Sequence, residues 1–426
     1  MRSNLEITEK WTKVPAQLSV ASITDKQIRE NTAKLMENQR RNALNEDFGM
    51  NVGAPLGANQ GIPYGGDGKA VFAPIAMALV RRVFPNLFAN VLVGVQPLNG
   101  PVGLAYALRF LYKDKNSDKI VEAGWKSVPK YSGYSGSTAN TSGIPDAGTG
   151  VETESAEHWK VQTGSAEDFT KMPELGMMIS RQAIVAKSRK LSASFSIESA
   201  EDIKRMQNVD MMTEMVKMLQ YEMTAELDRE TIGHCKNLCI KKVFNKSTST
   251  AQDNNNWIGR WSQERFSGIV TQIMRYANQI RTATRRSAAN IAVVSPDMAT
   301  VLQSAAPFFN KIVTNVNGSA ATPEVGTLNS SIKVYCDQYA VDEHMNLDNG
   351  QVLLAFKGSE NNDAGVIFCP YITGLVNQAI DPNDFSPRIG VMSRYAFADN
   401  MLGAENYYRL LEFKSLFATP TETSEW

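Results

Sequence analysis

The histidines are the first side chains to weigh for chemistry, because imidazole titrates near neutral pH and serves both proton transfer and metal binding. The chain has only three, His158, His234 and His344. None lies in a catalytic motif, and the sequence has no Gly-x-Ser-x-Gly elbow of the kind that presents a nucleophilic serine. We therefore interpret each histidine as structural or solvated, and we expect no catalytic residue.

The cysteines invite a metal-site interpretation, because Cys235 and Cys239 stand one helical turn apart and directly follow His234. A tetrahedral zinc site takes four ligands, and no second Cys or His pair has suitable spacing. The two other cysteines are Cys336 and Cys369. We expect four free thiols of a reducing compartment, with no metal and no cofactor.

A glycine-rich stretch at residues 61–70, GIPYGGDGKA, has the composition of a phosphate-binding loop. Aligned on its Gly-Lys pair, that motif requires glycine at position 63 and serine or threonine at position 70. The chain has Pro63 and Ala70 there. The stretch is therefore interpreted as a flexible linker.

Two further groups of residues have a structural and a functional interpretation. Adjacent arginines at 81–82 and 285–286 predict a solvated face or, more specifically, salt bridges between subunits. A cluster of methionines fills a core more often than it forms an adaptable binding groove. The methionines concerned are Met206, Met211, Met212, Met215, Met218 and Met223. Since no nucleophile, base, metal set or cofactor loop emerges, the sequence does not favour an enzyme.

Composition limits the class of protein further. The chain has 426 residues, enough for two or three domains, and 44 basic residues balance 44 acidic ones. A neutral chain argues against dedicated nucleic-acid binding. No apolar run approaches the ~20 residues of a membrane span, and the first residues lack a secretory signal. We expect a protein made and kept in a cytoplasm, with no membrane partner.

The element that organises the chain is a long helix predicted from Asp210 to about His234. Its apolar residues recur at three- and four-residue intervals, which is typical of one helix face. Asp210 is a suitable N-cap, and Gly233 is a suitable stop. We interpret this helix as the spine on which the flanking segments pack.

The segments before the spine predict a helix over 25–44 with a thin apolar stripe, a flexible arm over 47–70, a short helix over 71–84 and a strand from Leu87 to Val95. Alternation over 104–112 predicts a second strand. Residues 113–173 are then rich in Gly, Ser, Thr and Asn, too long for an ordinary loop and too polar to bury a core. Strand patterns return at 176–186 and 191–197. We expect an extended hairpin that projects from the body.

The segments after the spine predict a separate compact unit. The polar stretch 247–257 marks a boundary, and residues 258–380 alternate helix and strand patterns. They include a helix from Ser262, a strand from Ile291 to Val294 and a helix starting at Pro296. Residues 381–426 carry strand patterns that return to the body.

Several short motifs resemble the major capsid proteins of T-even-like tailed phages, and they occur in family order. They are Val80-Arg81-Arg82-Val83-Phe84-Pro85-Asn86-Leu87, Gly94-Val95-Gln96-Pro97, Asn99-Gly100-Pro101, Ala186-Lys187-Ser188-Arg189-Lys190-Leu191, Glu226-Leu227-Asp228-Arg229-Glu230, Gly259-Arg260-Trp261 with Glu264-Arg265-Phe266, Asp363-Ala364-Gly365, Cys369-Pro370-Tyr371, and Phe385-Ser386-Pro387-Arg388-Ile389-Gly390 with Arg394-Tyr395. Each motif is weak by itself. In order they are a strong signal, and the resemblance covers most of the chain from residue 20 onward.

The resemblance implies an α+β protein with the tailed-phage major-capsid fold. The implied parts are an N-terminal propeptide-like helix (1–46), an N-arm (47–70), the start of the peripheral domain (71–112), an extended hairpin called the E-loop (113–175), the peripheral domain with the spine helix (176–246), the axial α/β domain (258–380) and a C-terminal return (381–426). It implies a structural protein of the virion, assembled in the host cytoplasm, that forms hexamers and tiles an icosahedral or elongated shell around double-stranded DNA.

The implied partners are other copies of the chain, vertex, scaffold and decoration proteins, a prohead protease, and packaged DNA held without sequence specificity. T-even relatives carry a folded lobe in the E-loop, and residues 113–175 are too short and too rich in Gly and Ser for one. The protease of the family cuts after Leu-x-Glu or Ile-x-Glu. Leu44-Asn45-Glu46 fits at the predicted helix-to-linker junction, so we expect cleavage between Glu46 and Asp47. Ile7-Thr8-Glu9 also fits, but a cut there would leave the helix attached.

Two alternatives stay open. The first, within the same fold, is a pentameric vertex paralogue or the shell protein of a nanocompartment. The second, from another class, is a soluble α/β enzyme built on residues 258–380.

Overall fold

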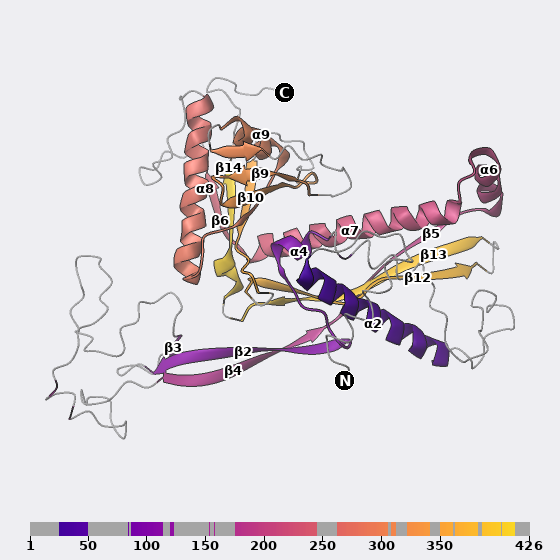
Figure 1. The fold of residues 1–426 in the computed structure, drawn as a ribbon, viewed down its shortest axis with the longest axis horizontal. Helices are drawn as coiled ribbons and strands as arrows, with labels where there is room; N and C mark the ends of the chain where they lie inside the picture. Colours follow the sequence, from indigo (N-terminus) through magenta and orange to yellow (C-terminus); the bar gives the residue numbers. More distant parts are fainter. Residues whose placement is uncertain are drawn as a thin grey trace.

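The structure is a computed structural model. It describes residues 25–49, 84, 87–113, 120–122, 153, 157, 175–244, 262–305, 308–311, 322–340, 350–360, 363–381, 386–401 and 403–413. Figure 1 shows an elongated molecule in which one long helix joins a four-stranded sheet to a separate α/β unit, while a hairpin projects away from both. The α+β class is confirmed.

The spine helix is α7, Met211–Leu238. Its 28 residues span about 42 Å at ~1.5 Å per residue. The helix is longer than predicted, because Gly233 lies inside it and the chain leaves the helix at Cys239. A single glycine weakens a helix without ending it when packing on both sides is favourable. Asp210 is the N-cap residue, but its carboxylate accepts a hydrogen bond from Thr213 Oγ1 (2.6 Å) rather than from a backbone N–H.

Beside α7 lies a four-stranded sheet in the order β1–β12–β13–β5. The strands are β1 (Gly94–Val95), β12 (Val366–Ile380), β13 (Pro387–Asp399) and β5 (Lys187–Ser194). β12 extends 11 residues beyond the segment 366–369 predicted from sequence, since it continues through Pro370 and Gly374. Both residues interrupt a strand pattern, and the pairing of β12 with β13 shifts register at that place.

The α/β unit is built on a seven-stranded sheet in the order β6–β14–β11–β7–β10–β9–β8. The bounds are β6 Ile240–Phe244, β7 Ile291–Val294, β8 Phe309–Lys311, β9 Glu324–Leu328, β10 Ile332–Cys336, β11 Gly350–Ala355 and β14 Tyr408–Phe413. The helices of this unit are α8 (Ser262–Thr284) and α9 (Pro296–Ser304), and the short 3-10 helix η2 (Ala404–Tyr407) precedes β14. Sheet membership therefore differs from the expected grouping, because β12 belongs to the other sheet whereas β6 and β14 belong here.

The projecting hairpin consists of β2 (Val102–Lys113) and β4 (Leu175–Val185), with the short β3 (Ile120–Glu122) beside β2. Both long strands match the prediction. The hairpin is attached to the body by a small buried cluster that is separate from the main core. Its members are Leu98, Ile184, Ala186, Cys369, Ala396 and Ala398.

Residues 87–95 differ from the predicted strand. Ala89–Leu92 form the short helix α4, and only Gly94 and Val95 form β1. A short apolar run fits a buried helix turn as well as a buried strand, so periodicity alone does not separate them. The predicted helix over 71–84 lies outside the described residues except for Phe84. The strand predicted over 191–197 ends at Ser194 as β5, and Ile197 begins the helix α6, Ile197–Gln207.

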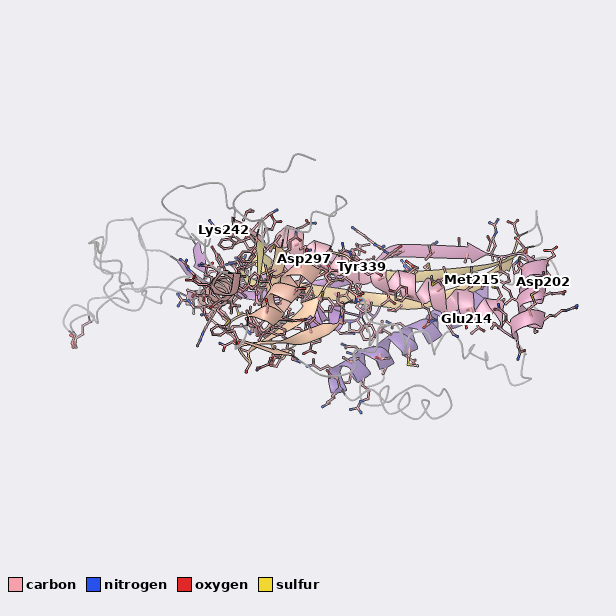
Figure 2. All side chains as sticks on the ribbon, turned by 90° about the horizontal axis from the view of Figure 1, so that it is seen from above. Asp202, Glu214, Met215, Lys242, Asp297 and Tyr339 are labelled. Carbon is pink, nitrogen blue, oxygen red and sulfur yellow. The ribbon has the colours of Figure 1, made fainter. Side chains whose placement is uncertain are left out.

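The N-terminal helix α2, Lys26–Gly49, crosses β12 (Figure 1). Its thin apolar stripe is deeply buried, with Ala33, Leu35 and Met36 in the main core. Seen from above, α2 runs beside the strands of the four-stranded sheet (Figure 2). In this view Asp202 marks α6 at one end, and Lys242 and Asp297 mark the α/β unit. In the part of the chain that the structure covers, no helix is long and apolar enough to cross a membrane.

Candidate functional site

The hairpin presents one apolar face to solvent. Tyr106 pairs with Arg181 and Phe110 with Met177, and directly paired residues project to the same side of a ribbon. The large hydrophobic residues exposed on this side, which we call the arm face, are Val102, Leu104, Tyr106, Phe110, Leu175, Met177, Ile179 and Val185. A soluble monomer rarely exposes so continuous an apolar surface, so the arm face marks an interaction surface.

The opposite face of the hairpin has a different composition. Near the root it carries Gly103 and Ala105, and Ile184 there is buried against the body. Further out it carries Ala107 paired with Ser180. Beyond Ser180 this face also carries Arg109 paired with Met178, which is its one large hydrophobic residue among those exposed in the described hairpin. Because eight exposed large hydrophobic residues gather on the arm face, we interpret the arm face as the binding surface.

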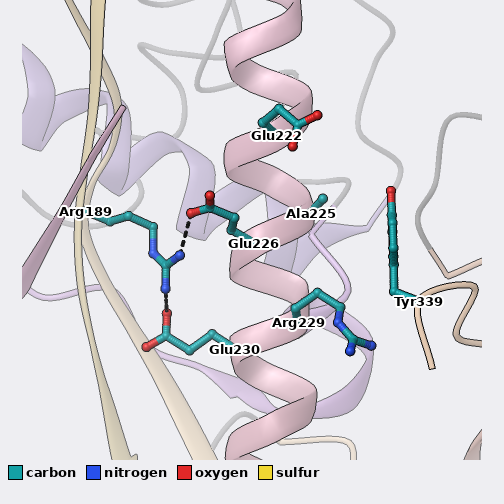
Figure 3. Close-up of a pocket in the computed structure, with 7 residues that line it drawn as sticks. All are labelled: Arg189, Glu222, Ala225, Glu226, Arg229, Glu230 and Tyr339. Carbon is teal, nitrogen blue, oxygen red and sulfur yellow. Dashed lines mark hydrogen bonds and ion pairs between the residues drawn. The ribbon is translucent and has the colours of Figure 1, made fainter. Parts of the chain in front are cut away.

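A second candidate is an open cavity of about 510 Å³ against α7 (Figure 3). It is lined by Arg189, Glu222, Ala225, Glu226, Arg229, Glu230 and Tyr339. These residues come from three parts of the fold: β5, one stretch of α7, and the segment after β10. Two arginines beside three glutamates in a cleft could bind a charged ligand, so their partners decide the question.

Arg189 is held by two carboxylates of α7. Its Nη1 and Nη2 lie 2.5 Å from Glu226 and Glu230, and its Nε donates to the hydroxyl of Tyr395 (3.0 Å). Tyr395 in turn donates to Glu230. Burial lowers the pKa of Arg189, but its bonds to Glu226 and Tyr395 outweigh this and raise it. Burial and the bond to Glu230 raise the pKa of Tyr395 to about 12. The cluster fastens α7 to β5 and β13.

Arg229 holds α7 on its other side. Its Nη1 lies 2.7 Å from Asp337, whose side chain is only 1% exposed at the end of β10. The guanidinium also lies 6.0 Å from the centre of the Tyr339 ring, and Tyr339 meets Tyr221 hydroxyl to hydroxyl at 3.1 Å. Because both arginines are engaged within the chain, we interpret the cavity as a joint between the two sheets and not as a ligand site.

Asp228 is the most strongly perturbed carboxyl near this joint. It is 4% exposed and accepts a hydrogen bond from the N–H of Phe88 (2.8 Å). Burial raises its pKa to about 7, with a further contribution from Asp337 and opposition from the Phe88 bond. A perturbed pKa accompanies many active sites, but here the group fixes the turn before α4.

The histidines and cysteines do not assemble a site within the described residues. His234 Nε2 lies 2.7 Å from Asp399 and its ring stacks on Phe397 at 5.1 Å, which is a structural role. His158 and His344 lie outside the described residues. The four cysteines are free, and no group of His, Cys, Asp or Glu suited to a metal occurs in the parts that the structure covers.

The spine methionines divide between core and surface. Met223 is buried, and Met212 and Met215 pack against the main core, as the core-filling interpretation expects. Met206 and Met218 are exposed instead. Of the arginine pairs, Arg286 forms a salt bridge to Asp363 (2.7 Å) within the chain, and Arg81 and Arg82 lie outside the described residues.

The residues of the expected cleavage site lie in α2. The helix ends at Gly49, so Leu44, Glu46 and Asp47 occupy its C-terminal turns, whereas the sequence placed them at the junction with a linker. Their side chains lie outside the description. What sequence reasoning missed is the opposite half of α2, where polar side chains hold the body. The signal was present as ENQ at residues 37–39, since amides inside an otherwise apolar stripe indicate buried hydrogen bonds.

Known proteins resemble this chain in sequence and in fold. The model of the family described as major capsid protein Gp23 matches residues 69–415. A major capsid protein of Serratia phage KSP90 is 28% identical over 348 residues, covering 77% of each chain. One of Vibrio phage KVP40 is 24% identical over 496 residues, covering 93% of each. Among solved structures, the capsid of Myoviridae phage XM1 is similar with a TM-score of 0.42 at 10% identity, covering 76% of this chain and 91% of that one.

Proposed function

We propose, because the chain belongs to the Gp23 family of major capsid proteins, that its projecting hairpin joins neighbouring copies into the hexameric capsomers of a phage head. The protein is a structural subunit of the virion capsid and not an enzyme, and it assembles with itself into the shell. The proposal concerns how the copies hold one another.

The observation that carries the proposal is the arm face. Burying one large apolar side chain contributes roughly 1.5–3 kcal/mol, and eight such residues project on one side of β2 and β4. The hairpin extends away from its own body, so a neighbouring copy is the surface that would bury this face. A hairpin that meets a different surface on the next copy makes a heterologous contact, and such contacts close into rings.

Paired substitutions test the arm face. Tyr106→Ser with Ile179→Ser removes two large side chains from it, whereas Ala107→Ser with Met178→Ser puts two serines on the opposite face and removes its exposed methionine. We expect the arm-face variant to fold with an unchanged circular dichroism spectrum and to sediment as small species, while the control forms shells in electron micrographs. Shells like those of the wild type from the arm-face variant would overturn the proposal.

The same micrographs separate hexamers from the vertex paralogue, because a hexameric subunit fills the facets and a pentameric one occupies only the corners. We further propose that the E-loop, residues 113–175, adds contacts between copies to those of the arm face, and that the seven-stranded unit lies at the capsomer axis. Scaffold, vertex and decoration proteins are the further partners proposed, and packaged DNA lies on the inner face without sequence specificity.

We also propose that a prohead protease cuts between Glu46 and Asp47. A bond in the last turn of a helix is accessible after fraying of that turn, since helix ends open more readily than centres. The intact mass of the chain from mature virions measures this directly. The mass of a chain that begins at Asp47 would support processing, and the mass of a chain that begins at Met1 would contradict it.

A further inference from the structure

Helix α2 holds the body through three amide side chains. Asn31 Nδ2 donates to the carbonyl of Val95 (3.4 Å), and Asn38 Nδ2 donates to the carbonyls of Leu98 (2.7 Å) and Tyr371 (3.3 Å). Gln39 Nε2 donates to the carbonyl of Gly374 (3.5 Å). All three amides are buried, so these bonds form away from competing water.

Two of the four acceptors, the carbonyls of Tyr371 and Gly374, are available because β12 is irregular where α2 crosses it. The other two, those of Val95 and Leu98, lie at the end of β1 and in the segment after it. The register with β13 shifts between Pro370 and Ile372 and again between Ile372 and Leu375. Tyr371 and Gly374 have no partner in that ladder, and Gly374 adopts a positive φ of 73°. On the other side, β1 pairs with β12 only at Ile367 and Phe368. The irregular segment therefore presents backbone carbonyls that need donors from elsewhere.

The spacing along α2 fits these acceptors. Residues 28, 31, 35, 38 and 39 share one helix face, with apolar Ile28 before the first amide and Leu35 between the first and second. An entirely apolar stripe would leave the carbonyls of β12 buried without donors, which is costly. At the start of the helix, Gln27 Nε2 adds a bond to the carbonyl of Ser359 (3.1 Å). The surface is thus selective for a helix that carries amide donors at this spacing.

One feature of the contact limits its strength. Gln39 is 1% exposed, and its Oε1 has no hydrogen-bond partner among the described residues. A buried acceptor without a donor subtracts from the free energy of docking. Much of the occupancy of this surface then comes from the covalent link, which holds α2 at a high effective concentration.

We propose that α2 is a detachable ligand of the body and that its binding site is the irregular segment of β12, residues 370–375, together with the adjacent carbonyls of Val95 and Leu98. The segment stays docked while the chain is continuous and leaves on dilution once the link after residue 46 is cut. The timing of release rests on the proposed processing, but the binding site itself does not.

The test uses the full chain with a specific protease sequence inserted between Gly49 and Met50. After cutting, the fraction of the released segment that co-elutes with the body on size exclusion is measured over a dilution series. The variant Asn38→Leu removes two hydrogen bonds while favouring helix, and Arg29→Leu introduces the same side chain at an exposed position of α2. We expect the wild type and Arg29→Leu to share one Kd and Asn38→Leu to bind at least tenfold more weakly.

The proposal is overturned if the wild-type segment separates at every concentration, or if Asn38→Leu binds as tightly as the wild type. Hydrogen exchange on the uncut chains shows whether the body of Asn38→Leu keeps its protection in β12 and β13. If it does not, Asn31→Leu, which loses its bond to Val95 instead, takes its place in the same assay. A virion protein that begins at Met1 would contradict natural processing and leave this result intact.

Discussion

At the residue scale, two partly exposed arginines tie α7 to both sheets. Arg189 bonds two glutamates and a tyrosine, and Arg229 bonds a buried aspartate on the opposite side of the helix. Arginine suits both positions because its planar guanidinium donates in several directions at once, which a lysine cannot reproduce. The cavity between them therefore results from two sets of ion pairs that hold opposite sides of α7.

Asp228 predicts how stability depends on pH. Its pKa in the folded chain, about 7, lies above the ordinary value of 3.8, so the folded state binds this proton more tightly than the unfolded state. The stabilisation is fully present below about pH 4 and is lost as pH rises through about 7. Between pH 5 and 8 the loss amounts to roughly 2–3 kcal/mol.

Urea unfolding of Asp228→Asn at pH 5 and pH 8 measures this loss. The amide keeps an oxygen for the Phe88 N–H and never ionises, so we expect the variant to lack this part of the pH dependence. Asp202→Asn, at an exposed position of α6, is the control and should behave as the wild type does. Equal pH dependence in the wild type and Asp228→Asn would contradict the assignment.

At the scale of elements, one glycine can be replaced by alanine and another is required by its backbone conformation. Gly233 lies inside α7 with open space where a Cβ would be, so Gly233→Ala should stabilise the chain by about 0.5–1 kcal/mol. Gly374 has a positive φ in β12, so Gly374→Ala should destabilise it by about 1–2 kcal/mol. Thermal unfolding of the two variants checks both signs, and a shift of the same sign in both would be the contrary result.

Elements with a strong local pattern were predictable. The strand at Ile291–Val294 and the helix from Pro296 match the structure, as do the long strands of the hairpin. The length of β12 was not predictable, because Pro370 and Gly374 interrupt its pattern and only pairing with β13 maintains it. The docking of α2 was also missed, because its donors serve carbonyls that are free only in the folded body.

The arm face predicts how the shell responds to salt at the scale of the whole molecule. Eight of its large residues are apolar, with Arg181 beside them, and the net charge of the chain is zero. Salt screens contacts between charges, and it leaves apolar burial intact. Raising NaCl from about 0.1 to about 0.5 M, where the Debye length falls to less than half of ~10 Å, should therefore leave shell yield unchanged in sedimentation. A steep loss of shells would show that charged contacts dominate.

The sequence also predicted the need for a partner, though not its place. Alternation in β2 and β4 indicated strands, and the long polar excursion indicated a projecting hairpin. The structure shows which face of the hairpin is exposed, because Ile184 on the other face is buried in a cluster with Ala396 and Ala398. The contact with the body decides which face is left for a neighbour.

The root of the hairpin has a mechanical consequence. Six residues form a cluster there that shares no member with the main core, and three of them lie on β12 and β13. The ribbon can tilt if its own three residues slide over those two strands. A subunit that flexes at such a pivot can meet neighbours at slightly different angles while its two sheets keep their packing. One sequence can then fit both the flatter and the more sharply curved regions of a closed surface.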